Sequence, residues 1–191
     1  MKTMREILSE TEGNKEKYFE ERTNRHIGLV KKYCKRIHDY DKEKFPDIIE
    51  QGNRHDYTKF KSPEREPYID ISWYYRLKRQ GKKYDVTPEQ QKEMDKASAH
   101  HINKSPHHPE YHSRVDIPIN SKNRDKPVEG TKVDATSMDT DNIAEMVADW
   151  CAMSEEVGGT PKKWADSTVN KRWKFTSEQT KLIYKLIEAI W

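Results

Sequence analysis

The feature that most constrains this fold is a stripe of side chains repeated every three or four residues along residues 14–39. Its members are Phe19, Thr23, His26, Val30, Tyr33 and Ile37. This spacing follows the 3.6-residue turn of an α-helix, whereas a strand would show strict alternation. Lys, Arg, Glu and Asn occupy the other positions, as is typical of a solvated face. A helix with one apolar stripe needs partners, so we expect helices packed around a shared core.

Further helices are predicted at 41–51, within 61–86, and at 88–104, 140–156 and 177–191. Gly52 is expected to end the helix at 41–51 in the left-handed conformation. No convincing alternating strand is present. The sequence therefore predicts an all-α fold, a single-domain helical bundle of five to seven helices over residues 1–191.

Three of these helices have clear start signals. Thr87 and Pro88 form an N-cap followed by a first helical proline, and Asp139 or Thr140 caps the helix that follows later. Thr176 and Gln179 match a capping box before the last helix. That last helix is amphipathic, which fits packing within the chain or contact with a second copy in a homo-oligomer.

Residues 113–136 are polar and lack helical periodicity, and they contain Pro118, Pro127 and Gly130. A stretch of this length without regular structure is typical either of a disordered loop or of a functional flap. We predict a long loop or flap here.

Charge and cysteine content narrow the class of protein. The 36 basic and 33 acidic residues leave a net charge of +3, which argues against a dedicated nucleic-acid binder. The N-terminus has no apolar signal core, and no run reaches the roughly 18 apolar residues of a membrane span. Cys34 and Cys151 lie in helical runs and are expected to be unpaired core residues. We expect a cytoplasmic protein with no membrane partner.

The titratable residues suggest a metal site. Five of the eight histidines fall between residues 100 and 112. His26 lies within the apolar stripe, His55 directly precedes Asp56, and Asp149 lies at the edge of a second apolar face. A carboxylate in such a place needs a cation or several donors. Imidazoles and carboxylates from facing helices are suitable ligands for an ion that activates water.

Other interpretations of the same residues remain open. His26 could be a core histidine bonded to a neighbour, and His55–Asp56 could be a helix cap with a surface ion pair. The histidines of residues 100–112 could form a surface loop that binds metal adventitiously. Lys59 could simply face solvent.

The order of these residues adds a family resemblance. His26, then His55–Asp56, then a distant Asp149 resembles the HD-domain superfamily of metal phosphohydrolases over about residues 20–155. The segment HDYTKF resembles the HDxGK element of the two-metal branch that includes the HD-GYP phosphodiesterases, and Lys59 takes the place of its phosphate-contacting lysine. Together with HHINKSPHH and MVADWCAM, it is also similar to an uncharacterised phage and bacterial family of this superfamily.

The sequence matches in part the motifs that hold the second metal in that branch. His101, and His107 with His108, resemble its extra metal-binding histidines, and HHPE resembles its HHE element with Glu110 one residue late. There is no GYP, and the interval between His101 and His107 is shorter than in that branch. Cleavage of cyclic dinucleotides is therefore not expected.

The resemblance implies hydrolysis of a phosphate ester, with a nucleotide or cyclic nucleotide as the favoured substrate. His26, His55, Asp56 and Asp149 would hold a divalent transition metal (Mn, Fe, Zn, Co or Ni). His101 and His107 would help to hold a second ion bridged by Asp56. The remaining groups, Lys59, His100 and His108, would offset charge on the phosphoryl oxygens.

Two further features suit a nucleotide. The basic run Arg76–Lys83 could attract an anion, although such runs also occur in solvated loops. Trp73, Tyr74 or Tyr75 could stack a base, although such aromatic residues more often pack in a core.

Two other functions are compatible with these residues. One is a di-iron oxygenase on an HD-like scaffold, which anaerobic metal analysis would reveal. The other is a non-catalytic protein that binds and sequesters a nucleotide, which would show binding without turnover.

Overall fold

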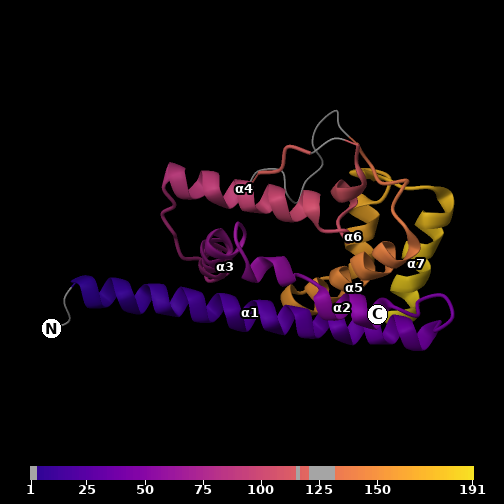
Figure 1. Cartoon of the computed structure of the whole chain (residues 1–191), viewed down its shortest axis with the longest axis horizontal. Helices are drawn as coiled ribbons and strands as arrows, with labels where there is room; N and C mark the ends of the chain where they lie inside the picture. Colours follow the sequence, from indigo (N-terminus) through magenta and orange to yellow (C-terminus); the bar gives the residue numbers. More distant parts are fainter. Residues whose placement is uncertain (1–3, 115–116, 121–131) are drawn as a thin grey trace.

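In a computed structural model, the described part of the chain comprises residues 4–114, 117–120 and 132–191, with side chains described from residue 13. It contains seven α-helices and two short 3-10 helices (Figure 1). The α-helices are α1 (Met4–Tyr40), α2 (Ile48–Arg54), α3 (Arg65–Arg79), α4 (Pro88–Lys104), α5 (Thr140–Val157), α6 (Pro161–Thr168) and α7 (Ser177–Ile190). The 3-10 helices are η1 (Tyr57–Phe60) and η2 (Pro109–His112). The all-α prediction is confirmed.

Helix α1 lies along the longest dimension of the molecule (Figure 1). It runs beneath the other helices, with α3 packed along it nearer the N-terminus and α2, α5 and α7 packed nearer its end (Figure 1). It is longer than the predicted 14–39, because the chain is already helical from Met4. The predicted stripe is buried, since Phe19, Val30 and Ile37 have no exposed surface.

The buried apolar residues form two clusters. The larger joins the second half of α1 to α2, α5, α6 and α7, and the smaller joins Phe19 to α3 and α4. Between the two clusters on α1 lies His26, which is only 2% exposed. On α4, His101 stands beside the small cluster at Ala97 and the large cluster at Ile102. The polar residues considered below therefore lie where the two apolar clusters meet.

The helix starts agree closely with their capping signals. Thr87 and Thr176 each form a capping box, and Asp139 caps α5 by accepting from the backbone N–H of Asn142. Helix α6, which was not predicted, also has a cap at Thr160, followed by Pro161. Local side-chain hydrogen bonds thus decide where four of these helices begin.

The prediction for 41–51 was wrong in two ways. Residues 41–45 form turns, with the Lys44 N–H bonded to the Asp41 carboxylate, and α2 begins only after Pro46, which has no N–H to donate. Gly52 does not end α2. It lies buried inside the helix, with its Cα so close to Cys34 that an added Cβ would lie 2.8 Å from the Cys34 sulfur. The first residue after α2 with a positive φ is Asp56, at 58°.

Two very short strands complete the described part. β1 (Val133–Asp134) pairs in parallel with β2 (Trp173–Lys174), with Val133 opposite Trp173. Two residues are too few to give an alternating pattern, which is why none was predicted. Most of the predicted loop or flap of 113–136 lies outside the described residues. Within the described residues, no helix is both long enough and apolar enough to cross a bilayer.

Two expectations about packing are confirmed. Cys34 and Cys151 are buried and free. The apolar face of α7 is buried within the chain at Ile183, Leu186 and Ile187. These residues therefore contribute to the protein's own core.

Candidate metal centre

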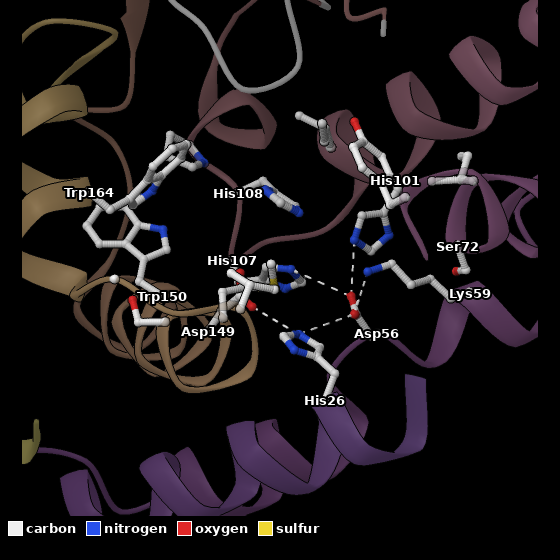
Figure 2. Close-up of a pocket in the computed structure, with 18 of the residues that line it drawn as sticks. His26, Asp56, Lys59, Ser72, His101, His107, His108, Asp149, Trp150 and Trp164 are labelled. Atoms are coloured by element: carbon white, nitrogen blue, oxygen red, sulfur yellow. Dashed lines mark hydrogen bonds and ion pairs between the residues drawn. The ribbon is translucent and has the colours of Figure 1, made fainter. Parts of the chain in front are cut away.

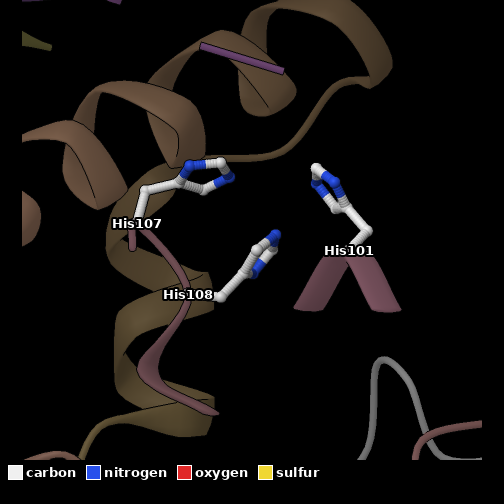
Figure 3. A group of neighbouring side chains, drawn as sticks. All are labelled: His101, His107 and His108. Carbon is white, nitrogen blue, oxygen red and sulfur yellow. The ribbon is translucent and has the colours of Figure 1, made fainter. Parts of the chain in front are cut away.

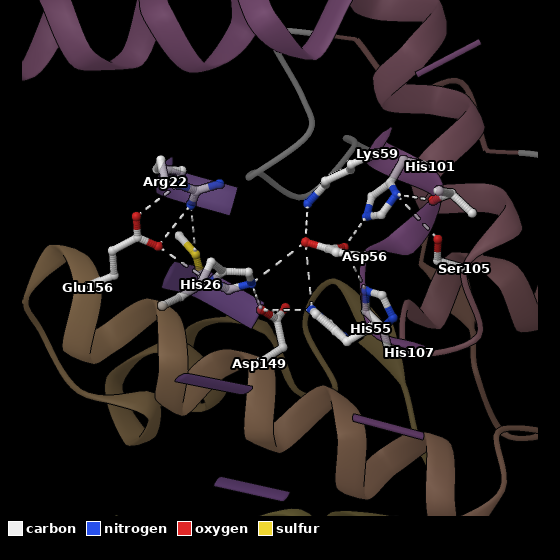
Figure 4. A network of polar contacts seen from close by, with 12 residues as sticks. Arg22, His26, His55, Asp56, Lys59, His101, Ser105, His107, Asp149 and Glu156 are labelled. Atoms are coloured by element: carbon white, nitrogen blue, oxygen red, sulfur yellow. Dashed lines mark hydrogen bonds and ion pairs between the residues drawn. The ribbon is translucent and has the colours of Figure 1, made fainter. Parts of the chain in front are cut away.

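Four residues from three distant parts of the sequence converge at the junction of the two apolar clusters. His26 comes from the middle of α1, Asp149 from α5, and His55 and Asp56 from the turn between α2 and η1 (Figure 4). Asp56 adopts the left-handed backbone conformation, which Asp tolerates better than most residues. The predicted set is thus brought together in space, and all four side chains except that of Asp149 are at most 3% exposed.

One group of ligand atoms surrounds the Oδ2 atom of Asp56. The His26 Nε2 atom lies 3.8 Å from this oxygen and 3.0 Å from the Asp149 Oδ1 atom. The His55 Nε2 atom lies 3.7 Å from Asp56 Oδ2 and 3.9 Å from Asp149 Oδ1. With bonds of about 2.0–2.2 Å, two ligands of one ion can be at most about 4 Å apart. These separations therefore fit a single ion.

A second group surrounds the other oxygen of the same carboxylate. The Asp56 Oδ1 atom lies 3.1 Å from His101 Nε2 and 3.9 Å from His107 Nε2. His108 completes a triad with His101 and His107, in which each ring offers a nitrogen within 4.8 Å of the others (Figure 3). Asp56 thus directs one oxygen to each group, as a carboxylate that bridges two ions would.

Two buried glutamates and the partly buried Glu156 lie on the far side of these histidine rings. Glu145 lies 2.7 Å from His55 Nδ1 and 3.3 Å from His107 Nδ1. Glu64 lies 2.9 Å from His101 Nδ1, and Glu156 lies 3.4 Å from His26 Nδ1. Each contact leaves the Nε2 atom facing the centre. Carboxylates in this position orient histidine ligands of metals and increase their basicity.

Sequence reasoning missed all three glutamates. For two of them a signal was available, because Glu145 and Glu156 lie four residues before and seven after Asp149, on the same face of α5. Glu64 carried no such signal, since only the packing of α4 against η1 and α3 brings it to His101.

Burial and pairing together set the ionisation of this centre. Burial by itself disfavours the charged forms, but hydrogen bonds from His107 and His55 hold the pKa of Glu145 at about 2. The pKa of Asp149 is likewise lowered despite its burial, because His26 is bonded to it. The pKa of His55 is lowered by burial. The centre therefore has anionic carboxylates together with at least one neutral imidazole.

These residues fit a divalent transition metal. The donor set is imidazole and carboxylate, which suits Zn, Fe, Mn, Co or Ni. The His55 Nε2 atom is also buried without a hydrogen-bond partner among the described residues, although it faces two carboxylates. Buried polar atoms in proteins normally have a partner, and a bound cation would supply one.

The centre forms part of the wall of a cavity of about 620 Å³. Lys59 lines this cavity, with its Nζ atom 2.5 Å from Asp56 Oδ2, and His108 lines it as well (Figure 2). Four other cations are on the wall: Arg22, Arg79, Lys163 and Arg172. The cavity is therefore suited to an anionic ligand.

Several predicted substrate contacts lie elsewhere. His100 does not line this cavity, and its ring bonds instead to the Oε1 atom of Glu64. Trp73 and Tyr74 are also absent from the cavity wall, whereas Tyr75 is part of it. Of the basic run Arg76–Lys83, only Arg79 reaches the cavity.

Glu110, the residue compared with the HHE element, does not join the histidines. Its Oε1 atom accepts hydrogen bonds from Arg172 at 2.9 Å and from the Trp173 indole at 2.8 Å. This buried ion pair ties η2 to β2 on the wall of the same cavity.

The fold and this centre define a helical protein with a buried histidine–carboxylate cluster beside a cationic cavity. The chain belongs to a protein family described as a family of unknown function (DUF5662), whose model matches residues 15–189. No curated protein and no solved structure matches the chain.

Proposed function

We propose that this protein is a metal-dependent phosphohydrolase that cleaves phosphate esters of nucleotides or cyclic nucleotides. The observation that carries the proposal is the division of the Asp56 carboxylate between two groups of imidazoles. Ions held in this way would share one bridging ligand and lie side by side, an arrangement used for displacement at phosphorus. We also propose that the protein belongs to the HD-domain superfamily.

The reaction is hydrolysis of one ester bond by in-line displacement at phosphorus. Water adds its oxygen to phosphorus, the ester P–O bond breaks, and the alcohol leaves with a proton. A bound divalent metal supplies Lewis-acid charge and a water of lowered pKa. Asp56 would be a ligand of both ions, and the glutamates behind the histidines keep the Nε2 atoms directed to the centre.

Lys59 and His108 are the groups placed to meet the phosphoryl oxygens. Both line the cavity beside the centre. Lys59 lies at its Asp56 edge and supplies a positive charge of the kind that offsets charge developing on transferred oxygens. The pKa of His108 is lowered well below the usual value, by burial and by the neighbouring His107 and His101, so its ring is a neutral donor.

The cationic wall favours this function over oxidation of a neutral polyol by a di-iron centre. Arg79 and Lys163 have no acidic partner among the described residues that line the cavity, so they can meet an anion. Charges of this kind would contribute little to binding a neutral polyol.

A screen for phosphate release tests the proposal. The purified protein is incubated with nucleotides, cyclic nucleotides and simple phosphate monoesters in Mn, Co, Ni or Mg. We expect turnover with at least one transition metal, and a loss of at least about 100-fold in Asp56→Asn. Asn tolerates the same left-handed backbone, so this variant removes charge with little strain.

Asp56→Ala run in parallel should be equally inactive. Phosphate release that survives both substitutions would show that the activity belongs elsewhere. Binding of nucleotides without any turnover would favour the sequestering function, and iron that changes colour on exposure to oxygen would favour the oxygenase.

A further inference from the structure

Three tryptophans form the side of the cavity that lies away from Lys59. Trp150 comes from α5, Trp164 from α6 and Trp173 from β2, and all three line the cavity. The rings of Trp150 and Trp173 are stacked at 5.7 Å, and Trp164 meets Trp173 edge-on at 6.3 Å. Figure 2 shows Trp150 and Trp164 on one side of the cavity, Lys59 on the other, and His108 and Asp149 between them.

Hydrogen bonds and burial fix the position of this tryptophan wall, formed by Trp150, Trp164 and Trp173. The Trp173 indole N–H donates to Glu110, which is itself paired with Arg172, and both charged residues are buried. Trp173 and Trp150 are 4% and 6% exposed, so little of either ring is available to a ligand. Trp164 is only partly buried. Its ring is therefore the available face of a preorganised aromatic surface.

The cavity is far larger than a phosphate group needs. Sites of roughly 300–1,000 Å³ normally hold whole small molecules, and this one has about 620 Å³. Beside Trp164, the side chains of Lys163, Ser167 and Thr160 also line the wall. The end of the cavity away from the histidines thus combines a flat apolar face with hydrogen-bonding groups, which suits a planar ring with a polar edge.

We propose that Trp164 stacks the base of a nucleotide whose phosphate lies at the histidine–carboxylate centre. This inference rests on the proposed function, which places the phosphate at the histidine–carboxylate centre. It implies that the alcohol released by hydrolysis is a nucleoside. The proposed base site does not include Trp73, whose ring packs against Tyr18 and Arg76.

Kinetics of the full-length, metal-loaded protein test the proposal. We compare the four ribonucleoside 5′-monophosphates with ribose 5-phosphate, which has the same phosphate but no base. Trp164→Ala should raise KM for at least one nucleotide about tenfold, at the lower end of what loss of base–aromatic stacking costs, and leave KM for ribose 5-phosphate unchanged. Trp164→Phe should stay within about threefold of the original protein, since it keeps an aromatic face.

Trp73→Ala is the matched control and should leave both constants unchanged. The proposal is overturned if Trp164→Ala affects both substrates equally, or if Trp73→Ala raises KM for nucleotides as much. Thermal melts monitored by circular dichroism accompany each variant. Should Trp164→Ala fail to fold, Trp164→Leu takes its place, because it keeps apolar volume but removes the ring.

A binding measurement separates this proposal from the hydrolase proposal. Adenosine, guanosine, cytidine and uridine are titrated into Asp56→Asn protein while tryptophan emission is recorded. Saturable quenching by at least one nucleoside, abolished by an added Trp164→Leu but not by Trp73→Phe, supports the ring site even if no substrate is turned over. Absence of quenching by all four, together with unchanged nucleotide KM in Trp164→Ala, rejects it.

Discussion

Asp56 decides the character of the centre at the scale of single residues. Its two oxygens face different imidazole groups, and its backbone has a φ of 58°. Non-glycine residues in this region carry a small conformational cost and often occur at functional sites. Here the turn places the carboxylate beneath both histidine groups, whereas a helical continuation of α2 would direct it elsewhere.

Glu145 gives the sharpest residue-scale prediction. It contacts the Nδ1 atoms of both His55 and His107, so Glu145→Gln should loosen one ligand of each group. We expect metal affinity to fall about 10- to 100-fold, measured by competition with a chromophoric chelator. Glu155→Gln, an exposed neighbour on α5 that pairs with Lys32, is the control and should not change affinity.

Equal metal affinity in Glu145→Gln and the original protein would contradict this role. The folded stability of both variants should be compared first, because Glu145 is buried and its amide replacement can weaken the fold by itself.

At the scale of elements, α5 is the framework of the site. A single face of this helix carries Glu145, Asp149 and Glu156, while its apolar residues enter the large core cluster. The next residue, Trp150, begins the tryptophan wall. One helix thus links the outer carboxylates, a ligand and the aromatic surface, because residues four and seven apart share a face.

The contact of α2 with α1 gives a prediction about stability. An alanine Cβ at position 52 would lie 2.8 Å and 3.0 Å from the Cys34 Sγ and Cβ atoms. Gly52→Ala should therefore lower the free energy of unfolding by about 1–3 kcal/mol, as overpacking does, measured by urea denaturation.

Gly28→Ala is the matched control on α1. A Cβ there meets nothing within 4 Å, so the substitution should be neutral or should stabilise by up to about 1 kcal/mol through helix propensity. Adding Cys34→Ala to Gly52→Ala should recover part of the loss. Destabilisation by Gly28→Ala equal to that of Gly52→Ala would show that backbone effects, not the close contact, dominate.

At the scale of the whole molecule, metal binding should couple the parts of the fold. The candidate ligands come from α1, α4, α5, the α2–η1 turn and the segment before η2. An ion bound only by the folded chain adds about 2.7 kcal/mol at 100 times its Kd. For a chain of this size we expect the melting temperature to rise by roughly 5–10 °C with Mn, Co, Ni or Zn.

Chelation with EDTA should reverse that rise. Asp149→Asn should show a clearly smaller rise, since His26 and His55 would then face only one carboxylate oxygen. An equal rise in Asp149→Asn would show that no stabilising ion lies between His26, His55 and Asp149.

The sequence by itself determined the all-α class, most of the helices and four central residues of the candidate site. Apolar periodicity and capping side chains are local properties, so α4, α5 and α7 could be predicted closely. His26 and Asp149 stood out as polar groups in or beside apolar stripes, and His55–Asp56 stood out as an adjacent pair that resembles a family motif. The predicted start of α2 was wrong because Pro46 and the turn at Asp41 interrupt the helical pattern.

Tertiary structure alone decided which distant side chains meet. Glu64 reaches His101, and Glu110 pairs with Arg172 rather than with the histidines, only because of how α4, η2 and β2 pack. The same packing places Trp164, not Trp73, on the cavity wall. Such contacts depend on the relative position of whole elements, which side-chain spacing within one element does not encode.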